Sequence, residues 1–189
     1  IRPVLLTEEE QAKAPGTFAT KKAIGKGLEG LTYRIQVSPY DCTGCGNCAD
    51  ICPAKTKALV MKPFASQSEV EDANWSFVVK EVSSKDDLDL TMNVKNSQFK
   101  TPLIEFSGAC AGCGETAYIK VVTQLFGDRM MIANATGCSS IWGGSAPSTP
   151  YTTNSKGQGP SWANSLFEDN AEYGLGMSLG VNQMRNKLA

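Results

Sequence analysis

The sequence contains no histidine among its 189 residues. Histidine is the only side chain whose ordinary pKa places its charge change near neutral pH, and it is the commonest metal ligand. Acid–base chemistry and metal binding in this chain therefore have to come from thiolates, carboxylates, backbone dipoles or a cofactor.

The chain also lacks a strong net charge and a long hydrophobic run. Lys and Arg number 18 and Asp and Glu 19, and no basic stripe stands out, which argues against nucleic acid as a partner. No apolar run approaches the roughly 20 residues that a membrane-spanning helix needs, so we expect no membrane partner. The first residue is Ile1 and not Met, and we expect an internal piece of a longer protein.

Cysteine, by contrast, is abundant and clustered. The stretch DCTGCGNCADICP holds four of the seven cysteines within eleven residues: Cys42, Cys45, Cys48 and Cys52. This spacing, closed by proline, is the iron–sulfur run of bacterial ferredoxins, in which the fourth cysteine ligates the other cluster. Gly44 and Gly46 give the loop the freedom to turn around a cluster. We expect the first three cysteines to hold one 4Fe-4S cluster and the fourth to reach a second, whose own run this sequence does not contain.

Two other interpretations of the run are weaker. Disulfides would pair an even number of thiols, but seven is odd, and no secretory leader is found at the start of the sequence. Zinc prefers two Cys-x2-Cys knuckles about 12 to 20 residues apart, so a third and fourth cysteine in one loop are superfluous. Iron–sulfur is therefore favoured, and reduced thiols in this number indicate a cytosol-like, low-oxygen setting.

Around this run, residues 1–62 are expected to form half of a ferredoxin-like α+β unit. Residues 1–30 are interpreted as a surface connector with a short helix that opens at a Thr7–Glu10 capping box. Residues 31–37 alternate apolar and polar, which predicts a strand leading into the cysteine loop, and residues 58–61 predict a second short strand. The polar segment 63–100 is interpreted as an extended connecting arm.

The character of the sequence changes at residue 101. Strands are expected at 102–106 and 130–133 and helices at 116–126 and 166–185. Residues 143–165, rich in Gly, Ser, Pro and Thr, are too long for a connector and are expected to form a functional loop. This order predicts an open α/β sheet over 101–189, with ligands beyond the carboxyl ends of its strands.

Three further cysteines follow these expected strands. Cys110 and Cys113 come after the first strand and Cys138 after the next, so both loops should reach the same crevice. Three thiolates are one short of a closed four-iron site. Either the fourth ligand lies outside this chain, or one iron stays open as a Lewis acid. Cys138 as a small buried hydrophobe is the plainer alternative.

The same loops suit an anion such as a diphosphate, through glycine amides and the start of a helix. Glu115, in the first turn of that helix, is favourable there by the helix dipole alone, so a structural role is as well supported as a functional one. The loop 157–170 mixes aromatic, amide and acidic residues. This loop would line the pocket of a planar cofactor, or it would cap a helix. From the residues alone, the second, structural interpretation is favoured.

Four motifs together resemble one family. They are DCTGCGNCADICP, EFSGACAGCGET, FGDRMMIANATGCSSIWGGSAPSTPY and GQGPSWANSLFEDNAEYGLGM, and they cover nearly the whole chain in order. The chain resembles the pyruvate:ferredoxin oxidoreductases, over part of their ferredoxin-like domain and the beginning of their thiamine diphosphate domain. That enzyme is several times longer, so the resemblance implies an internal segment.

The resemblance implies roles for individual residues. Cys110, Cys113 and Cys138 match ligands of the cluster nearest thiamine, whose fourth ligand lies beyond Ala189 in the family, which replaces the Lewis-acid interpretation. Glu115 and Cys138 match positions that touch thiamine diphosphate. One further residue, Phe167, matches a wall of its pocket. The run at Cys42 to Cys52 matches the second of two ferredoxin runs. No Gly-Asp-Gly followed by Asn is present, so the magnesium site is expected outside this segment.

The activity implied is oxidative decarboxylation of pyruvate with coenzyme A, with electrons passing through 4Fe-4S clusters to ferredoxin or flavodoxin. A homodimer in the cytoplasm, or in an anaerobic organelle of a eukaryote, is expected. No catalytic residue is assigned, and this segment alone is not expected to catalyse the reaction. The alternatives are an oxidoreductase for another 2-oxoacid, a stand-alone electron-transfer protein and a zinc-ribbon module.

Overall fold

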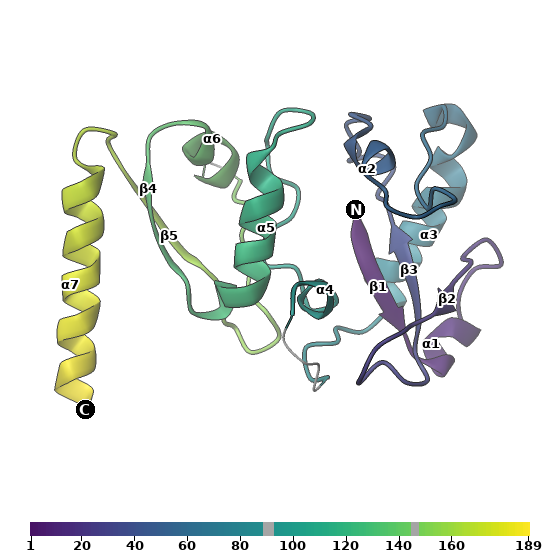
Figure 1. Ribbon diagram of the computed structural model, residues 1–189, viewed down its shortest axis with the longest axis horizontal. Coiled ribbons are helices and arrows are strands. Elements are labelled where there is room, and N and C mark those ends of the chain that lie inside the picture. Colours follow the sequence, from purple (N-terminus) through teal and green to yellow (C-terminus); the bar gives the residue numbers. More distant parts are fainter. Residues whose placement is uncertain (89–92, 145–147) are drawn as a thin grey trace. The chain divides into compact units, whose positions relative to one another are not determined.

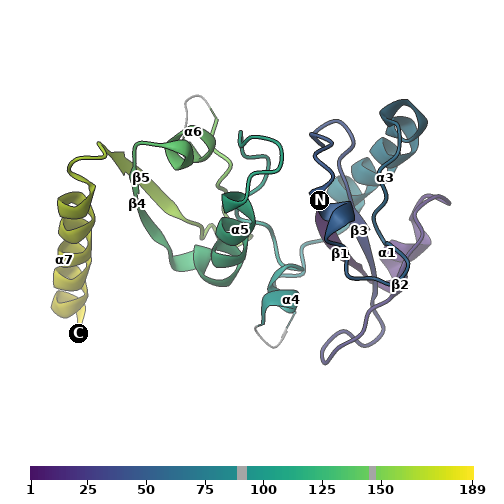
Figure 2. The same cartoon turned by 45° about the horizontal axis from the view of Figure 1, so that its top comes forward.

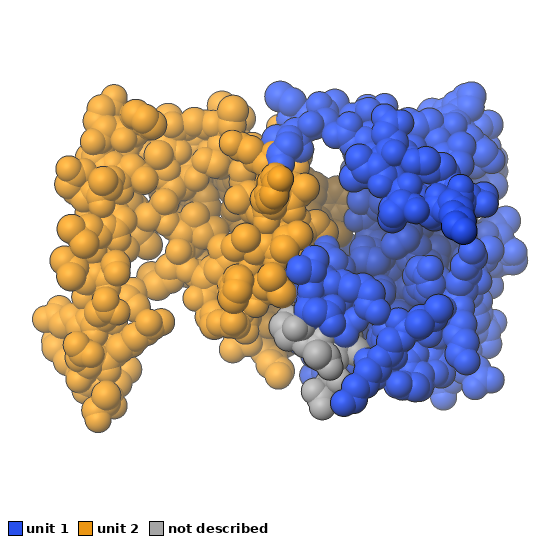
Figure 3. Space-filling view, in the orientation of Figure 1, with its two compact units in different colours: residues 1–101, 110–114 blue, residues 102–109, 115–189 orange. Residues whose placement is uncertain are grey.

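The chain forms two compact units in the computed structural model, which describes residues 1–88, 93–144 and 148–189. Unit 1 comprises residues 1–101 and 110–114, and unit 2 comprises residues 102–109 and 115–189 (Figure 3). Both units mix helices with a small sheet, so the coarse α/β expectation is confirmed.

Unit 1 is built on a three-stranded antiparallel sheet in the order β1-β3-β2 (Figure 1). The strands are β1 (Arg2–Leu6), β2 (Lys21–Lys22) and β3 (Thr32–Gln36), and Arg2 pairs with Gln36 at one end. The strand expected at 31–37 is confirmed as β3. The connector expected at 1–30 is wrong for its first part, because β1 is a buried strand of the sheet.

Strand β1 has apolar side chains on both faces, because successive side chains of a strand point in opposite directions. Val4 and Leu6 pack on one face with Phe18 and α3, and Leu5 packs on the other with Ala23 and Leu28. A short apolar run without alternation cannot be assigned by period, which is why the sequence did not reveal this strand.

Helix α3 (Ser68–Glu81) corrects the expectation of an extended arm over 63–100. Its inward face carries Asn74, Phe77 and Val78, all buried, and the Phe77 ring meets that of Phe18 edge-on with centroids 5.1 Å apart. The helix lies against the sheet in both views (Figures 1 and 2). Few of the fourteen residues of α3 are apolar and buried, so the helical period in the sequence was too weak to predict this helix. Residues 89–92 of the expected arm lie outside the described residues.

The capping box expected at the first helix is confirmed. Helix α1 (Glu8–Ala12) begins after Thr7, whose Oγ1 accepts from Glu10 N at 3.2 Å, while Glu10 Oε2 accepts from Thr7 N at 2.9 Å. The Glu10 carboxylate also accepts from Lys85 Nζ at 2.9 Å and from Ser83 N at 2.8 Å. Glu10 therefore ties α1 to the segment that follows α3.

The remaining elements of unit 1 are short. They are α2 (Asn47–Asp50), the 3-10 helix η1 (Phe64–Ser66) and α4 (Val94–Ser97). The second strand expected at 58–61 does not form: this segment is bends and irregular chain. Helix α2 lies inside the cysteine run.

Unit 2 contains a parallel pair of strands flanked by helices. Strand β4 (Met131–Ala135) pairs in register with β5 (Ser161–Ser165), from Met131 opposite Ser161 to Ala135 opposite Ser165. The helices are α5 (Glu115–Phe126), α6 (Cys138–Gly144) and α7 (Asn170–Leu188), with a 3-10 turn η2 (Gly127–Arg129) after α5.

Several sequence expectations for unit 2 can now be checked. The helices at 116–126 and 166–185 and the strand at 130–133 are confirmed as α5, α7 and β4. At 102–106 there is only an isolated bridge between Ile104 and Tyr151 and no strand. The loop expected at 143–165 ends in strand β5, which the mixed residues SWANS did not reveal; residues 145–147 lie outside the described residues.

The apolar side of α5 is not its buried side. Tyr118 is 77% and Val122 41% exposed, whereas Thr123 and Gln124 are buried. Gln124 Oε1 accepts from Leu103 N at 3.1 Å, and Thr123 Oγ1 donates to Ile119 O at 2.6 Å. Within the described ranges, no helix combines the length and hydropathy that crossing a membrane requires.

Candidate metal centre

The cysteine run begins at Cys42, six residues after the end of β3, and it contains the short helix α2. Gly44 and Gly46 have φ of +71° and +84°, the left-handed region that favours glycine. A Cβ on Gly44 would meet no atom within 4 Å, so the loop is open beside it. Ala49 N and Asp50 N both donate to Gly46 O, at 2.9 and 3.0 Å, and this turn carries Cys48. The two glycines therefore make the reversals that the spacing predicts.

The thiols of this run suit an iron–sulfur cluster. None of the seven cysteines forms a disulfide; Cys42 and Cys45 are exposed and Cys48 and Cys52 are half-buried. Ala58 N donates to Cys52 Sγ at 3.4 Å. The amides of Ala54 and Ala58 lower the pKa of the Cys52 thiol and so favour the thiolate that a metal binds.

The donor set agrees with the sequence prediction, although the side chains do not converge. In the part of the chain that the structure describes, no three Cys, His, Asp or Glu side chains lie close enough to hold a metal ion as they stand. Four thiols on one open loop, with an amide aimed at a sulfur, are the groups that bind and tune iron–sulfur clusters. The ligand assignment stays a prediction.

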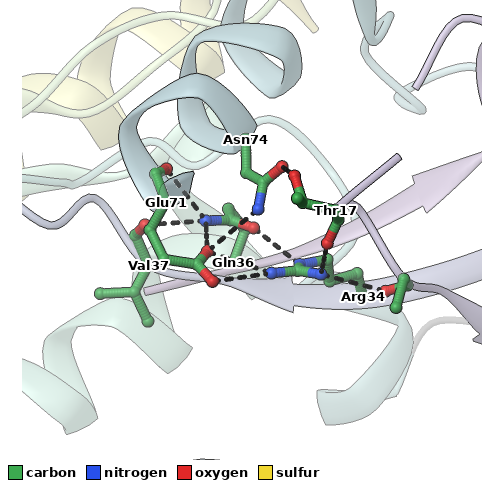
Figure 4. A network of polar contacts seen from close by, with 7 residues as sticks. Thr17, Arg34, Gln36, Val37, Glu71 and Asn74 are labelled. Atoms are coloured by element: carbon green, nitrogen blue, oxygen red, sulfur yellow. Dashed lines mark hydrogen bonds and ion pairs between the residues drawn. The ribbon is translucent and has the colours of Figure 1, made fainter. Parts of the chain in front are cut away.

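A polar network holds the strand that leads into the run (Figure 4). The Glu71 carboxylate on α3 accepts from Gln36 Nε2 at 2.8 Å and from Arg34 Nη2 at 3.0 Å, and Arg34 Nε donates to Gln36 Oε1 at 2.7 Å. Gln36 is completely buried. Thr17 Oγ1 donates to Asn74 Oδ1 at 3.0 Å and so connects the loop after α1 to α3.

The network is well matched in charge. Burial by itself raises the pKa of Glu71, but hydrogen bonds from Gln36 and Asn74 and the charge of Arg34 outweigh it, so the pKa lies below its ordinary value. Gln36 Nε2 also donates to Val37 O at 3.0 Å, one residue closer to the cysteines. Sequence analysis missed these residues because their partners lie about 35 positions apart and no local pattern marks them.

The second cysteine knuckle belongs to unit 1 as well. Residues 110–114 are assigned to unit 1, and Cys113 N donates to Cys110 O at 3.0 Å to close a tight turn. Between these cysteines, Gly112 has φ of +75°. Cys110 is exposed and Cys113 half-buried. Cys138 belongs to unit 2, so its expected meeting with this knuckle stays a prediction.

Of the three expected thiamine contacts, two begin helices of unit 2 and the third lies in the loop before another helix. Glu115 is the first residue of α5, Cys138 is the first residue of α6, and Phe167 lies in the loop between β5 and α7. All three helices begin at the end of the unit where β4 and β5 finish (Figures 1 and 2). Phe167 is 74% exposed and Cys138 is exposed. This is the edge at which parallel sheets bind ligands.

One segment of the chain matches a known protein family. Residues 35–56, which include the whole cysteine run, match the family described as a 4Fe-4S binding domain. The chain thus carries an iron–sulfur motif of the kind that its cysteine spacing predicts.

The whole chain is similar to several known proteins. It is 62% identical over 189 residues to pyruvate:ferredoxin oxidoreductase of Moorella thermoacetica and 64% identical to pyruvate-flavodoxin oxidoreductase of Enterobacter agglomerans. Both matches cover 100% of this chain and 16% of the relative. A mitochondrial pyruvate dehydrogenase [NADP(+)] of Euglena gracilis is 53% identical over 188 residues, which is 10% of its length. The chain spans about a sixth of the first two, and the resemblance predicted from the four motifs is confirmed.

Proposed function

We propose that this chain is an internal segment of a pyruvate:ferredoxin oxidoreductase. The observation that carries the proposal is the similarity of all 189 residues to that enzyme, at 62% identity, with the cysteine run inside the matched region. The overall reaction converts pyruvate and coenzyme A, with two one-electron acceptors in the oxidised form, into acetyl-CoA, carbon dioxide, a proton and two reduced acceptors.

In this proposal residues 1–62 are part of the ferredoxin-like domain, and residues 101–189 begin the thiamine diphosphate domain, with 63–100 joining them. The parallel pair β4–β5 is then part of the open sheet of that domain. The rest of the enzyme supplies the magnesium site and the pyruvate and coenzyme A pockets. We place the enzyme in the cytoplasm, or in an organelle of a eukaryote, as a homodimer.

The cysteines serve as cluster ligands. Cys42, Cys45 and Cys48 hold one 4Fe-4S cluster and Cys52 reaches another, while Cys110, Cys113 and Cys138 provide three ligands of a third. Each such cluster, when bound, takes up and releases one electron at a time. Hydrogen bonds such as that from Ala58 N to Cys52 Sγ, together with exposure to solvent, set its potential.

Thiamine diphosphate, when bound, supplies the carbanion chemistry of decarboxylation. Residues of this chain form one wall of its site: the start of α5 at Glu115, Cys138 and Phe167. Exposed helix amides at this edge favour a diphosphate. No residue of the segment is assigned a proton transfer, so its contribution is binding and orientation.

The electron acceptor is proposed to be ferredoxin or flavodoxin. The names of the relatives agree on pyruvate but differ in the acceptor: the relative at 62% identity is named for ferredoxin and the one at 64% for flavodoxin. The relative named for NADP is less similar, at 53%. An acid other than pyruvate is the second candidate for the substrate.

The test uses the longer enzyme that contains this chain, purified without oxygen. We expect iron and sulfide in equal amounts without zinc, and reduction of ferredoxin or flavodoxin that requires both pyruvate and coenzyme A. Zinc in place of iron would contradict the iron–sulfur assignment. Activity with another 2-oxoacid but not with pyruvate would contradict the substrate.

A further inference from the structure

The side chain of Lys57 folds back onto the end of the cysteine run. Its Nζ donates to Asp50 O at 2.7 Å and to Cys52 O at 3.0 Å. Asp50 is the last residue of helix α2, and the last carbonyls of a helix have no partner within the helix. A lysine side chain near the end of a helix is one of the groups that satisfy such carbonyls. Lys57 therefore joins the end of α2 to the last cysteine of the run.

The residue that follows Lys57 contacts the sulfur of the same cysteine. Ala58 N donates to Cys52 Sγ at 3.4 Å. Residues 53–63 belong to no helix or strand, so no regular ladder of backbone hydrogen bonds fixes the path of this segment. Two contacts close the chain between residues 52 and 58 into a loop: one is made by the Lys57 side chain and the other by the Ala58 backbone.

We propose that Lys57 is a positioning residue that fixes the turn between Cys52 and Ala58 and so keeps the Ala58 amide on the Cys52 sulfur. The inference rests on the proposed function, which makes Cys52 a cluster ligand. Lys57 suits this role because one ammonium group donates to two carbonyls, and the second of them belongs to Cys52 itself. Without the ammonium group the amide of Ala58 remains, but the turn that aims it loses both of these bonds.

The aim of this amide matters because a hydrogen bond to a ligand sulfur draws negative charge away from the sulfur. Such hydrogen bonds are one of the means by which a protein sets the reduction potential of an iron–sulfur cluster. They stabilise the more negative, reduced form, so the loss of one makes a cluster harder to reduce. We therefore expect the removal of Lys57 to lower the potential of the cluster that Cys52 ligates and to leave the other potentials unchanged.

The plainer role for Lys57 is a cap on α2. The carbonyls of Asp50 and Cys52 lie at the end of this helix or just beyond it, and a cap involves neither the sulfur nor Ala58. The two roles differ in what a substitution changes. Loss of a cap speeds the hydrogen exchange of residues 47–52, whereas loss of a positioning residue also speeds the exchange of residues 53–61 and changes a potential.

The experiment uses the complete enzyme, loaded with its clusters and kept anaerobic. Lys57→Met removes the ammonium group and keeps the length of the side chain. Lys55→Met is the matched control, because Lys55 is an exposed lysine of the same segment and its replacement removes the same charge. The measurements are iron and sulfide content, hydrogen exchange of residues 47–52 and 53–61 by mass spectrometry, and the reduction potentials of the clusters by electron paramagnetic resonance.

We expect Lys57→Met to keep the iron and sulfide content of the parent. Hydrogen exchange of residues 53–61 should become faster by about threefold or more, as the loss of a hydrogen bond implies. The potential of one cluster should become more negative while the others stay at their parent values. Lys55→Met should match the parent in all three measurements, because the effect depends on the contacts of Lys57 and not on the charge of the segment.

Unchanged potentials in Lys57→Met would overturn the proposal even if residues 47–52 exchanged faster, because Lys57 would then only cap α2. Unchanged exchange of residues 53–61 would overturn it as well, and so would an equal shift of potential in Lys55→Met. Loss of iron from Lys57→Met would show that Lys57 serves cluster assembly and not the position of the amide, which also overturns it. A parent enzyme without iron and sulfide would instead reject the proposed function.

Discussion

Single polar residues at buried positions hold unit 1 together. Glu10 is only 8% exposed and its carboxylate accepts from Lys85, Ser83 and Thr7, while the Lys85 side chain is itself 6% exposed. A buried charge is costly unless it is paired and hydrogen-bonded, so each partner depends on the other.

Replacing Glu10 by Gln should strongly destabilise the fold. The variant keeps the size of the side chain but leaves the Lys85 ammonium buried without a carboxylate, and we expect a loss of about 3–5 kcal/mol in the free energy of unfolding. Urea unfolding measures it. Glu9→Gln, in the same helix but exposed, is the matched control and should change stability by no more than about 0.5 kcal/mol. Equal effects of the two substitutions would contradict the role of this pair.

The same carboxylate should make stability depend on pH. Burial raises the pKa of Glu10, but hydrogen bonds from Thr7, Lys85 and Ser83 outweigh it and lower the pKa from the ordinary 4.5 to about 2. Because the unfolded chain binds the proton first, this stabilisation is complete above pH 4.5 and is lost as the pH falls through about 2. We expect the advantage of the parent over Glu10→Gln in urea unfolding to shrink across this window. A constant difference would be inconsistent with the lowered pKa.

At the scale of elements, the strand that carries the cysteines depends on a helix that contains none of them. Strand β3 is held by β1 in the sheet and by Glu71 of α3 through Arg34 and Gln36. Helix α3 in turn packs on β1 through Phe77 and Val78. The segment interpreted as an arm is therefore part of the core that supports the iron–sulfur loop.

Phe77→Ala tests this role of α3. Phe77 is 7% exposed and contacts the Phe18 ring, so truncation leaves a cavity and should cost about 3–5 kcal/mol in the free energy of unfolding. Val79→Ala, two residues away on the same helix and 57% exposed, is the control and should be nearly neutral. If chemical unfolding shows no difference between the two variants, α3 is not part of the core.

At the scale of the whole molecule, the proposed function gives this chain two roles: it supplies cysteines for electron transfer and one edge of a cofactor site. Cys138, the first residue of α6 shortly after β4, is proposed to serve both roles. In the complete enzyme, we expect Cys138→Ala to abolish reduction of the acceptor while carbon dioxide release from pyruvate stays detectable. Acceptor reduction and carbon dioxide release are measured in parallel, with Ser139→Ala as the neighbouring control. Loss of both activities, or of neither, would count against Cys138 as a cluster ligand.

Local patterns predicted part of this arrangement. The capping box at Thr7, the alternation in β3 and the apolar period of α5 each lie within a few residues of sequence, so each could be recognised. Strand β5 could not, because SWANS has neither alternation nor β-branched residues and forms only by pairing with β4. Helix α3 could not, because its buried face is only three residues wide.

The sequence by itself determined the iron–sulfur motif of this chain. Thiolate spacing is a property of one short loop, and four long motifs in order are enough to reveal relatives. Only the tertiary structure decided which side chain supports the strand that enters the run: Glu71 of α3, which accepts from Gln36. The physical reason is that this contact joins residues about 35 positions apart, and such a pair depends on the path of the whole chain and not on any local preference.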